Sequence, residues 1–568
     1  MNPGIPMQSA FTARDRLVLI VVLAGALGLR LLGVQYGLPF LFITDEYHEV
    51  MRAMQLGSGS FNFGRTGKGG LYLLLFVEYG VYFLILKLQG VVDTAMDFAR
   101  QFTRDPSAFY LMGRVTVALF GTWTVLLIAL ASREAFSRRA GILAALFLSV
   151  NILHAHLSRV AVVDVVMTCF LTGALLFAFK IANRGLPRDY LWAAVFAALA
   201  TTTKIPAILL VVPLIIAHVY NIRRTGGGLG GMLRYRAFWI AVAVFAAILI
   251  STNPGIVPGI GNYVGLFVGD EGASAALLDE EYVAPTVERP NLFLYYFLAL
   301  QESMGWPLFV VCLAGLGYGL WRRTSADVLL ASFGLLFYLA IAGTSSDHLY
   351  YTRYALPVVA VLIMLGGRLI DLAWRSSSAP GRVAIALATG LVAALPLYET
   401  AVRGWVLTQA DTRALARDWI DKNLPQGSRI YIEGAKIAPV RSTVPLQDSA
   451  ENIKRRIEYW KVAEPRQAEF LKLRLQVLEG ATFNLELAPL TGTEPLAAYR
   501  NKAVNYFVIV PDRYLQSRNS NVNSARLLKE LRGADDVALI KRFDADPRRP
   551  GPTIEIYGLE PVATDGAS

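Results

Sequence analysis

Long apolar runs separated by short polar segments dominate the first 400 residues of the chain. An α-helix needs about twenty mostly apolar residues to cross the hydrocarbon core of a membrane, and several of the runs are somewhat shorter. The pattern predicts a mainly α, polytopic membrane protein with about eleven transmembrane helices. These helices are expected near residues 17–34, 110–131, 140–157, 162–181, 189–203, 205–220, 237–252, 292–320, 326–343, 354–371 and 382–399.

Basic residues gather in every second connection between these runs. Cytoplasmic loops carry an excess of Lys and Arg, so we assign these connections and the N-terminus, with Arg14 and Arg16, to the cytoplasm. The expected location is the bacterial inner membrane, with the other connections on the external or periplasmic side. The basic residues are Arg133, Arg138, Arg139, Lys180, Arg184, Arg188, Arg223, Arg224, Arg234, Arg236, Arg322, Arg323, Arg375 and Arg382.

One further apolar stretch, Leu71 to Leu88, is long enough to span but contains Glu78 and Lys87. Counting it as a span would place every later basic connection outside the cell, against the usual charge rule. We therefore interpret it as an in-plane or re-entrant helix within a large external loop, residues 35–109. This loop belongs to a transmembrane catalytic domain that we expect to cover residues 1–405.

The composition changes after Val406, and residues 406–568 predict a water-soluble α/β domain on the external side. Its signs are a helix-to-strand pattern in RALARDWIDKNLPQGSRIYIEG, a charged helical stretch near 450–478, and a strand in NYFVIV. A helix in SARLLKELRG and strands near DVALIKRF and PTIEIYGL follow. A second external loop, 253–289, is acidic and rich in Gly and Pro.

The amino-acid composition is that of a membrane protein. The chain is 55% hydrophobic and only 17% charged, which excludes an ordinary soluble protein of this size. The net charge of +11 is explained by the basic connections, so we predict no nucleic-acid partner. Cys169 and Cys312 both lie in apolar runs, which argues against a disulfide framework or a thiolate metal cluster. We expect the first helix to be an uncleaved anchor.

An acidic cluster, TDEYHE at residues 44–49, follows the first apolar run directly. Carboxylates at a membrane edge are costly unless they face water, pair with cations or take part in chemistry, so the cluster is a functional-site hypothesis. The alternative is a solvated loop at a helix end. Three other polar sets are expected on the same external face. They are Lys68; His154, His156, Arg159 and Asp164; and Asp347, His348, Tyr351, Arg353 and Tyr354.

Acids on two loops and cations on two others suit the transfer of a sugar from a lipid phosphate. A carboxylate takes the proton of an acceptor hydroxyl as that oxygen attacks the anomeric carbon. Lys or Arg side chains neutralise the departing phosphate.

Five segments resemble the GT-C membrane glycosyltransferases, with the protein O-mannosyltransferases and the lipid A aminoarabinose transferases as the nearest relatives. They lie in this order over most of residues 15–400, which makes them more specific together than singly. The segments are TDEYHEV, GKGGLYLLL, YLMGRVTVALFG, HLSRVAVVD and YYTRYALPVV.

The resemblance implies that Asp45 is the catalytic base or acceptor-orienting acid, with Glu46 beside it and Asp164 as the second external acid. Lys68 matches a Lys that binds the donor phosphate, although Gly69 and Gly70 stand where that family has two prolines. The other residues expected at the donor phosphate are Arg353, Arg159 and Lys204. The alternative for Lys204 is that its side chain only extends to the membrane surface. The residues expected to shape the donor and acceptor sites are His48, His156, His348 and Tyr351.

We therefore predict an inverting glycosyltransferase that moves one sugar from a polyprenyl-phosphate donor to a glycan, lipid or protein acceptor on the external face of the membrane. No metal site is predicted, because His154 and His156 lack a matching Cys or Glu and are expected to hydrogen-bond the first loop. A divalent cation as cofactor is left open. The absence of a Trp-Trp pair disfavours transfer of a whole glycan to Asn. The alternative function is a transporter or flippase for a lipid-linked or anionic substrate, although no internal symmetry is evident.

Overall fold

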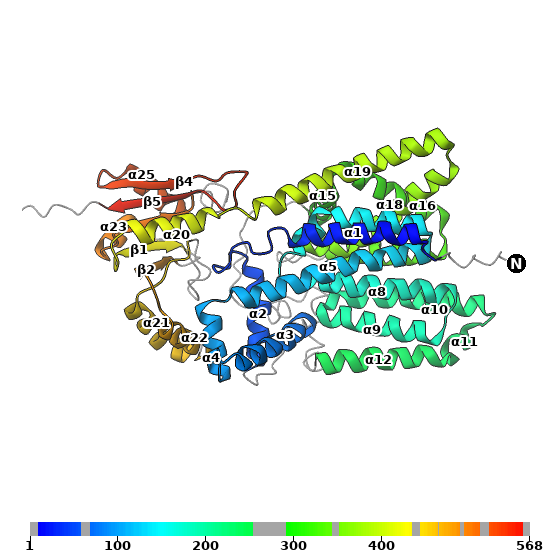
Figure 1. Cartoon of the computed structure of the whole chain (residues 1–568), viewed down its shortest axis with the longest axis horizontal. Coiled ribbons are helices and arrows are strands. Elements are labelled where there is room, and N and C mark those ends of the chain that lie inside the picture. Colours follow the sequence, from blue (N-terminus) through cyan, green and yellow to red (C-terminus); the bar gives the residue numbers. More distant parts are fainter. Residues whose placement is uncertain are drawn as a thin grey trace, which may run out of the picture.

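The computed structural model describes residues 10–57, 69–253, 291–343, 351–433, 444–463, 465–488, 494–511 and 522–559. A long helical bundle carries a smaller α/β domain at one end, which we call the domain end (Figure 1). The predicted fold class, a mainly helical membrane protein with a C-terminal α/β part, is confirmed. Lys68, Asp347, His348 and the acidic loop from 254 to 289 lie outside the described residues.

The bundle is built from helices that follow the predicted apolar runs. Its basic connections lie at the end away from the α/β domain, where α1 also begins (Figure 1). The bundle consists of α1 (Ala13–Leu31), α5 (Ser107–Ala135), α6 (Arg138–Val150), α7 (Ile152–Leu157), α8 (Val163–Asn183), α9 (Pro187–Thr203), η1 (Ile205–Leu210), α10 (Val211–Arg224), α11 (Leu229–Arg234), α12 (Arg236–Thr252), α15 (Leu292–Met304), α16 (Trp306–Arg322), α17 (Ser325–Ala342), η3 (Thr352–Ala355), α18 (Leu356–Ser376) and α19 (Ala379–Val406).

Among the described residues, seven helical segments are long and apolar enough to cross a membrane, or eight if α15 and α16 form one bent span. The count of eleven spans stays a prediction. We expected one helix at 292–320. The structure differs, because the chain turns by 117° between α15 and α16. Gly305 adopts a φ of +72° at this turn and Pro307 follows, and this combination ends one helix and starts another.

Three helices of the first loop cover the domain end of the bundle: α2 (Thr44–Leu56), α3 (Gly69–Leu88) and α4 (Ala95–Arg104). By length and composition α3 is also a candidate span. Figure 1 places it beside α2, beyond the ends of α9 and α12, which agrees with our in-plane interpretation without testing it. The amphipathic α4 starts at a Thr94–Asp97 capping box and buries Phe98 and Phe102.

The α/β domain contains a five-stranded sheet with the order β2-β1-β3-β5-β4. Strands β2, β1 and β3 are parallel to one another, and β5 is antiparallel to both of its neighbours, β3 and β4. Separate apolar clusters around Ile420 and Leu527 pack against this sheet. We predicted every strand except β2. The elements are α20 (Thr412–Asn423), β1 (Arg429–Glu433), α21 (Ala450–Ala463), α22 (Pro465–Gln476), β2 (Asn484–Ala488), α23 (Leu496–Asn501), β3 (Tyr506–Ile509), α25 (Val522–Gly533), β4 (Val537–Phe543) and β5 (Ile554–Leu559).

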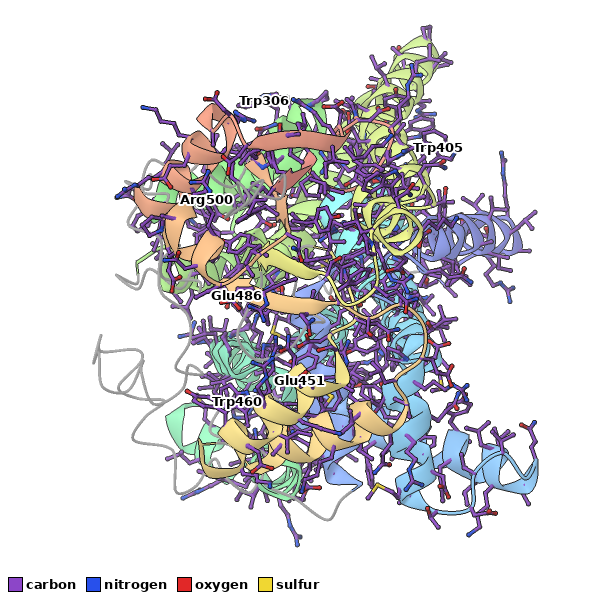
Figure 2. All side chains as sticks on the ribbon, turned by 90° about the vertical axis from the view of Figure 1, so that its left-hand side faces the viewer. Trp306, Trp405, Glu451, Trp460, Glu486 and Arg500 are labelled. Carbon is purple, nitrogen blue, oxygen red and sulfur yellow. The ribbon has the colours of Figure 1, made fainter. Side chains whose placement is uncertain are left out.

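Polar contacts attach this domain to the first loop. The hydroxyl of Tyr36 donates a 2.7 Å hydrogen bond to Asp411, and Arg413 donates to the same hydroxyl at 3.0 Å. Burial, reinforced by the Asp411 charge, raises the pKa of Tyr36. On the other side, Arg104 pairs with Glu479 at 2.6 Å. Figure 2 looks onto this end, where the domain lies across the bundle.

Candidate active site

The acidic cluster forms the first turn of α2, with Asp45 and Glu46 at the start of the helix. The partial positive charge of a helix N-terminus stabilises carboxylates in this turn. The two side chains have different surroundings: that of Glu46 is fully buried, whereas that of Asp45 is 46% exposed. Only Asp45 is therefore open to a substrate.

Glu46 forms a buried double hydrogen bond with Arg114 of α5, at 2.8 and 2.7 Å. It also accepts the backbone N–H of Ala161 at 2.7 Å. Arg114 in turn donates to the backbone carbonyls of Val34 and Tyr36. A buried ion pair with its remaining polar atoms satisfied in this way fixes geometry. The pair holds α2, α5, the first loop and the segment before α8 together, directly behind Asp45.

Asp45 forms an ion pair with Arg353 of η3. The guanidinium of Arg353 lies 4.3 Å from the ring centroid of Tyr351 and 5.6 Å from that of Tyr354, within range of cation–π attraction. Two aromatic rings thus hold Arg353 at Asp45. The tertiary structure unites residues from opposite ends of the predicted transmembrane region.

A second ion pair lies behind the first. Asp164, in the first turn of α8, accepts a 2.6 Å hydrogen bond from Nζ of Lys204, which follows α9. Both side chains are buried, and the Lys204 ammonium lies 4.0 Å from the ring centroid of Tyr354. Asp164 also attracts Arg353 electrostatically. The charges therefore alternate, from Asp45 through Arg353 and Asp164 to Lys204.

A pocket of about 320 Å³ opens in front of the first pair. Asp45, Arg353, His156 and Arg159 line it, whereas Asp164 and Lys204 do not. Arg159 donates hydrogen bonds to the backbone carbonyls of Leu29, at 2.7 and 3.2 Å, and of Thr400, at 3.1 Å. These contacts make Arg159 part of the pocket wall.

The remaining expected residues differ in their positions. Tyr351 lies against Arg353, and the ring of His48 contacts that of Tyr47 with centroids 5.8 Å apart. The ring of His154 is buried and its Nδ1 lies 2.9 Å from the guanidinium of Arg30, so it belongs to the interior of the bundle. Within the described part of the chain, no group of three or more His, Cys, Asp or Glu side chains is arranged to hold a metal ion.

Sequence reasoning missed two contributors. Arg114 is the one cation in the apolar run 110–131, and such a residue signals a buried partner because an unpaired charge there is costly. Glu49, to which we gave no role, is buried, lies 3.8 Å from Arg52 and attracts Lys204 electrostatically. Its position one helical turn after Asp45 is the signal that places it near the same site.

Comparison with known proteins gives a family match for part of the chain. The sequence model of the family described as Dolichyl-phosphate-mannose-protein mannosyltransferase matches residues 111–255. This region runs from α5 to α12 and includes Asp164, Arg159 and Lys204. No curated protein sequence matches the chain significantly.

Solved structures are similar to this chain over most of its length. ArnT from Cupriavidus metallidurans in the apo state has a TM-score of 0.51 and 14% identity, over 96% of this chain and 98% of that one. ArnT from the same organism bound to undecaprenyl phosphate has a TM-score of 0.48 and 16% identity, over 98% and 100%. The apo oligosaccharyltransferase of Archaeoglobus fulgidus has a TM-score of 0.47 and 11% identity, over 88% and 70%.

The resemblance that we read from the five sequence segments is therefore confirmed. Similarity to a solved structure at 14% sequence identity establishes the fold only. The identity of the donor and of the acceptor depends on the residues of the site. The chain is similar in fold to ArnT, and residues 111–255 match the sequence model of the Dolichyl-phosphate-mannose-protein mannosyltransferase family.

Proposed function

We propose that this protein is an inverting glycosyltransferase that moves a single sugar from a polyprenyl-phosphate donor to an acceptor hydroxyl at the domain end of the bundle. The observation that carries the proposal is the ion pair between Asp45 and Arg353 at the edge of an open pocket. A half-exposed carboxylate is suited to accept a proton, and the adjacent guanidinium is suited to hold a phosphate.

The donor phosphate replaces Asp45 as the partner of Arg353. Because the guanidinium presents a planar set of N–H donors, it binds a phosphate as readily as a carboxylate. Lys204 lies beyond Asp164 in the alternating series and does not line the pocket, so it adds its positive charge only at longer range. Asp45 loses its cation in this exchange and becomes a free carboxylate only when donor is present.

In the transfer step the acceptor oxygen attacks the anomeric carbon, and the bond between that carbon and the phosphate oxygen breaks. The acceptor proton passes to Asp45, and polyprenyl phosphate leaves with its charge neutralised by Arg353. A single displacement with one base inverts the anomeric configuration. Both oxygens of Glu46 already accept hydrogen bonds, so Glu46 is assigned to positioning. Asp164 is a positioning residue as well, because it is held in an ion pair with Lys204. Arg159 has a positioning role because it forms part of the pocket wall.

Purified protein incubated with a set of labelled polyprenyl-phosphate sugars tests the proposal. The expected result is release of free polyprenyl phosphate and appearance of a glycosylated acceptor. A transporter or flippase would instead move intact donor between leaflets without cleaving it. Movement of intact donor, with no cleavage of any sugar phosphate in the set, would contradict the proposal.

A further inference from the structure

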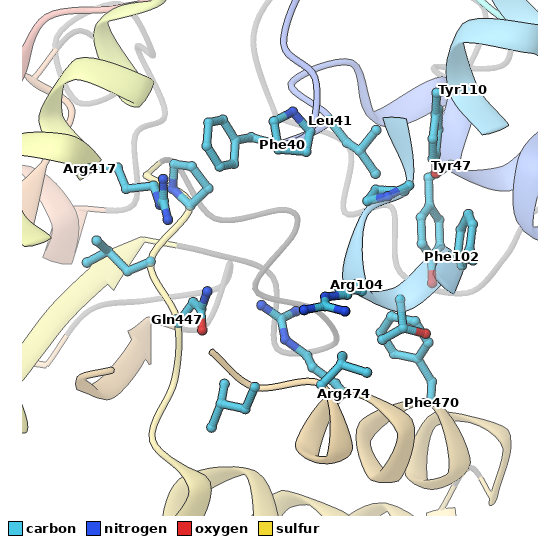
Figure 3. Close-up of a pocket in the computed structure, with 17 residues that line it drawn as sticks. Phe40, Leu41, Tyr47, Phe102, Arg104, Tyr110, Arg417, Gln447, Phe470 and Arg474 are labelled. Carbon is cyan, nitrogen blue, oxygen red and sulfur yellow. The ribbon is translucent and has the colours of Figure 1, made fainter. Parts of the chain in front are cut away.

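A second cavity, of about 320 Å³, lies between the first loop and the α/β domain (Figure 3). It is bordered by the segment before α2, by the end of α4, and by α20, α22 and the segment before α21. Its lining includes Arg104, Arg417 and Arg474, and none of the described residues that line it is Asp or Glu. The cavity has no part in the mechanism above.

The three arginines come from three separate elements and converge on one space. In Figure 3, Arg104 and Arg474 extend toward each other in the cavity, and Arg417 lies on its other side. The ion pair of Arg104 with Glu479 is mostly exposed, and such pairs contribute little. The pairs of Arg417 with Asp418 and Asp421 are long, at 3.5 and 3.4 Å. Substrate anions can therefore compete for these groups.

Arg474 has no side-chain ion pair or hydrogen bond among the described residues, although Asp448 attracts it from a distance. Asp448 itself pairs with Arg456 at 2.9 Å. Burial lowers the pKa of Arg474, as expected for a cation whose lost hydration is not replaced. An anion in the cavity would supply the missing partner.

Aromatic side chains form much of the remaining wall: Phe40, Tyr47, Phe102, Tyr110 and Phe470. Pockets that combine apolar walls with a few convergent charged groups are typical of sites for organic ligands, whereas sites for a lone inorganic ion need no such walls. The lining thus suits an oxyanion carried on a larger organic molecule such as a glycan.

The cavity and the catalytic pocket lie on two faces of one helical turn. Asp45 lines the catalytic pocket and Tyr47 lines the arginine cavity. Two residues apart in an α-helix, they point about 200° apart around the axis. A molecule that occupies both sites must be extended and must pass around the start of α2.

We infer that the cavity bounded by Arg104, Arg417 and Arg474 binds an anionic group of the acceptor, a carboxylate or phosphate on a glycan, at a distance from the hydroxyl that receives the sugar. This inference rests on the proposed function for the identity of its ligand as acceptor. The three arginines select an acidic acceptor and hold it, while Asp45 acts on its hydroxyl.

Binding without donor tests the inference separately from catalysis. Full-length protein in nanodiscs is titrated with three soluble disaccharides, which are neutral, carboxylated or phosphorylated, and with the phosphorylated headgroup on a lipid anchor. The charged disaccharides are expected to bind at least about tenfold more tightly than the neutral one, because hydrogen bonds between arginine and an oxyanion are charge-assisted. Tighter binding of the anchored form alone would assign the anion to a lipid headgroup.

The double variant Arg417→Gln/Arg474→Gln should lose the preference for charged ligands, and Arg417→Lys/Arg474→Lys should keep part of it. Arg500→Gln is the matched control, since Arg500, on α23 of the same domain, pairs with Asp536, which precedes β4 (Figure 2). Equal binding of neutral and charged disaccharides by the wild type would overturn the inference. Cleavage of donor would still support the proposed function in that case, and Asp45→Asn should leave disaccharide binding unchanged.

Discussion

Arg353 and Asp45 form an ion pair across 308 residues of sequence, at the edge of the pocket that we assign to catalysis. In this state the proposed base is neutralised by the group that is proposed to bind the donor phosphate. The pairing couples donor binding to proton transfer, because the Asp45 carboxylate becomes available when the donor phosphate binds Arg353 in its place. The first two predictions test this coupling.

Asp45→Asn should reduce sugar transfer by roughly 10²- to 10⁴-fold, since a positioned general base contributes about that much. Donor affinity should stay the same or increase, because Arg353 no longer has a competing carboxylate. Turnover and donor binding are measured separately, by release of polyprenyl phosphate and by titration. Asp535→Asn, an exposed change in the α/β domain, is the control; undiminished transfer by Asp45→Asn would reject the assignment of the base.

Arg353→Gln should weaken donor binding by about tenfold or more, because a charge-assisted contact to phosphate is lost. Arg353→Lys should recover only part of this affinity, since an ammonium lacks the planar pair of N–H donors. Arg375→Gln is a matched control, because Arg375 pairs with Asp371 at the other end of the bundle. Donor affinity equal to wild type in Arg353→Gln would show that the phosphate binds elsewhere.

Glu46→Gln should destabilise the protein by about 3–5 kcal/mol in the free energy of unfolding, because Arg114 is left as an unpaired buried charge. The double variant Glu46→Leu/Arg114→Met should be less destabilised than the sum of its single variants. Denaturant unfolding of the wild type, Glu46→Leu, Arg114→Met and the double variant measures the coupling, and Glu46→Gln is unfolded in the same way. A catalytic role for Glu46 would instead appear as lost turnover in a variant of normal stability.

Tyr36→Phe should loosen the contact between the first loop and the α/β domain, because the hydrogen bond to Asp411 is lost. The pKa of Tyr36 is raised in the folded protein, so the unfolded chain loses this proton first, near the ordinary value of about 10. The stability that the phenol contributes is present below this pH and is lost as the pH rises above it.

The Tm of wild type should therefore exceed that of Tyr36→Phe at about pH 8, and the difference should shrink toward pH 11. Other tyrosines are present in both proteins, so their ionisation cancels in this difference. A difference that does not change with pH would mean that the phenol is not the titrating group.

The sequence by itself determined the local elements of this protein. Apolar runs predicted the bundle helices, and short segments such as NYFVIV predicted four of the five strands, because the pattern of side chains on a helix or a strand is a local property. The break at Gly305 was not predicted, although a glycine before Trp306-Pro307 is a helix-ending signal. Residue type and position at a membrane edge selected Asp45, Asp164 and Arg353 as candidates.

Only the tertiary structure decided which of these residues meet. Asp45 and Glu46 are neighbours in sequence, yet one faces a pocket and the other is enclosed by Arg114 and Ala161. Arg159 resembles a phosphate ligand in sequence, yet its donors bind the backbone carbonyls of Leu29 and Thr400. The physical reason is that burial and pairing depend on contacts between distant segments, and these contacts are fixed only when the helices pack.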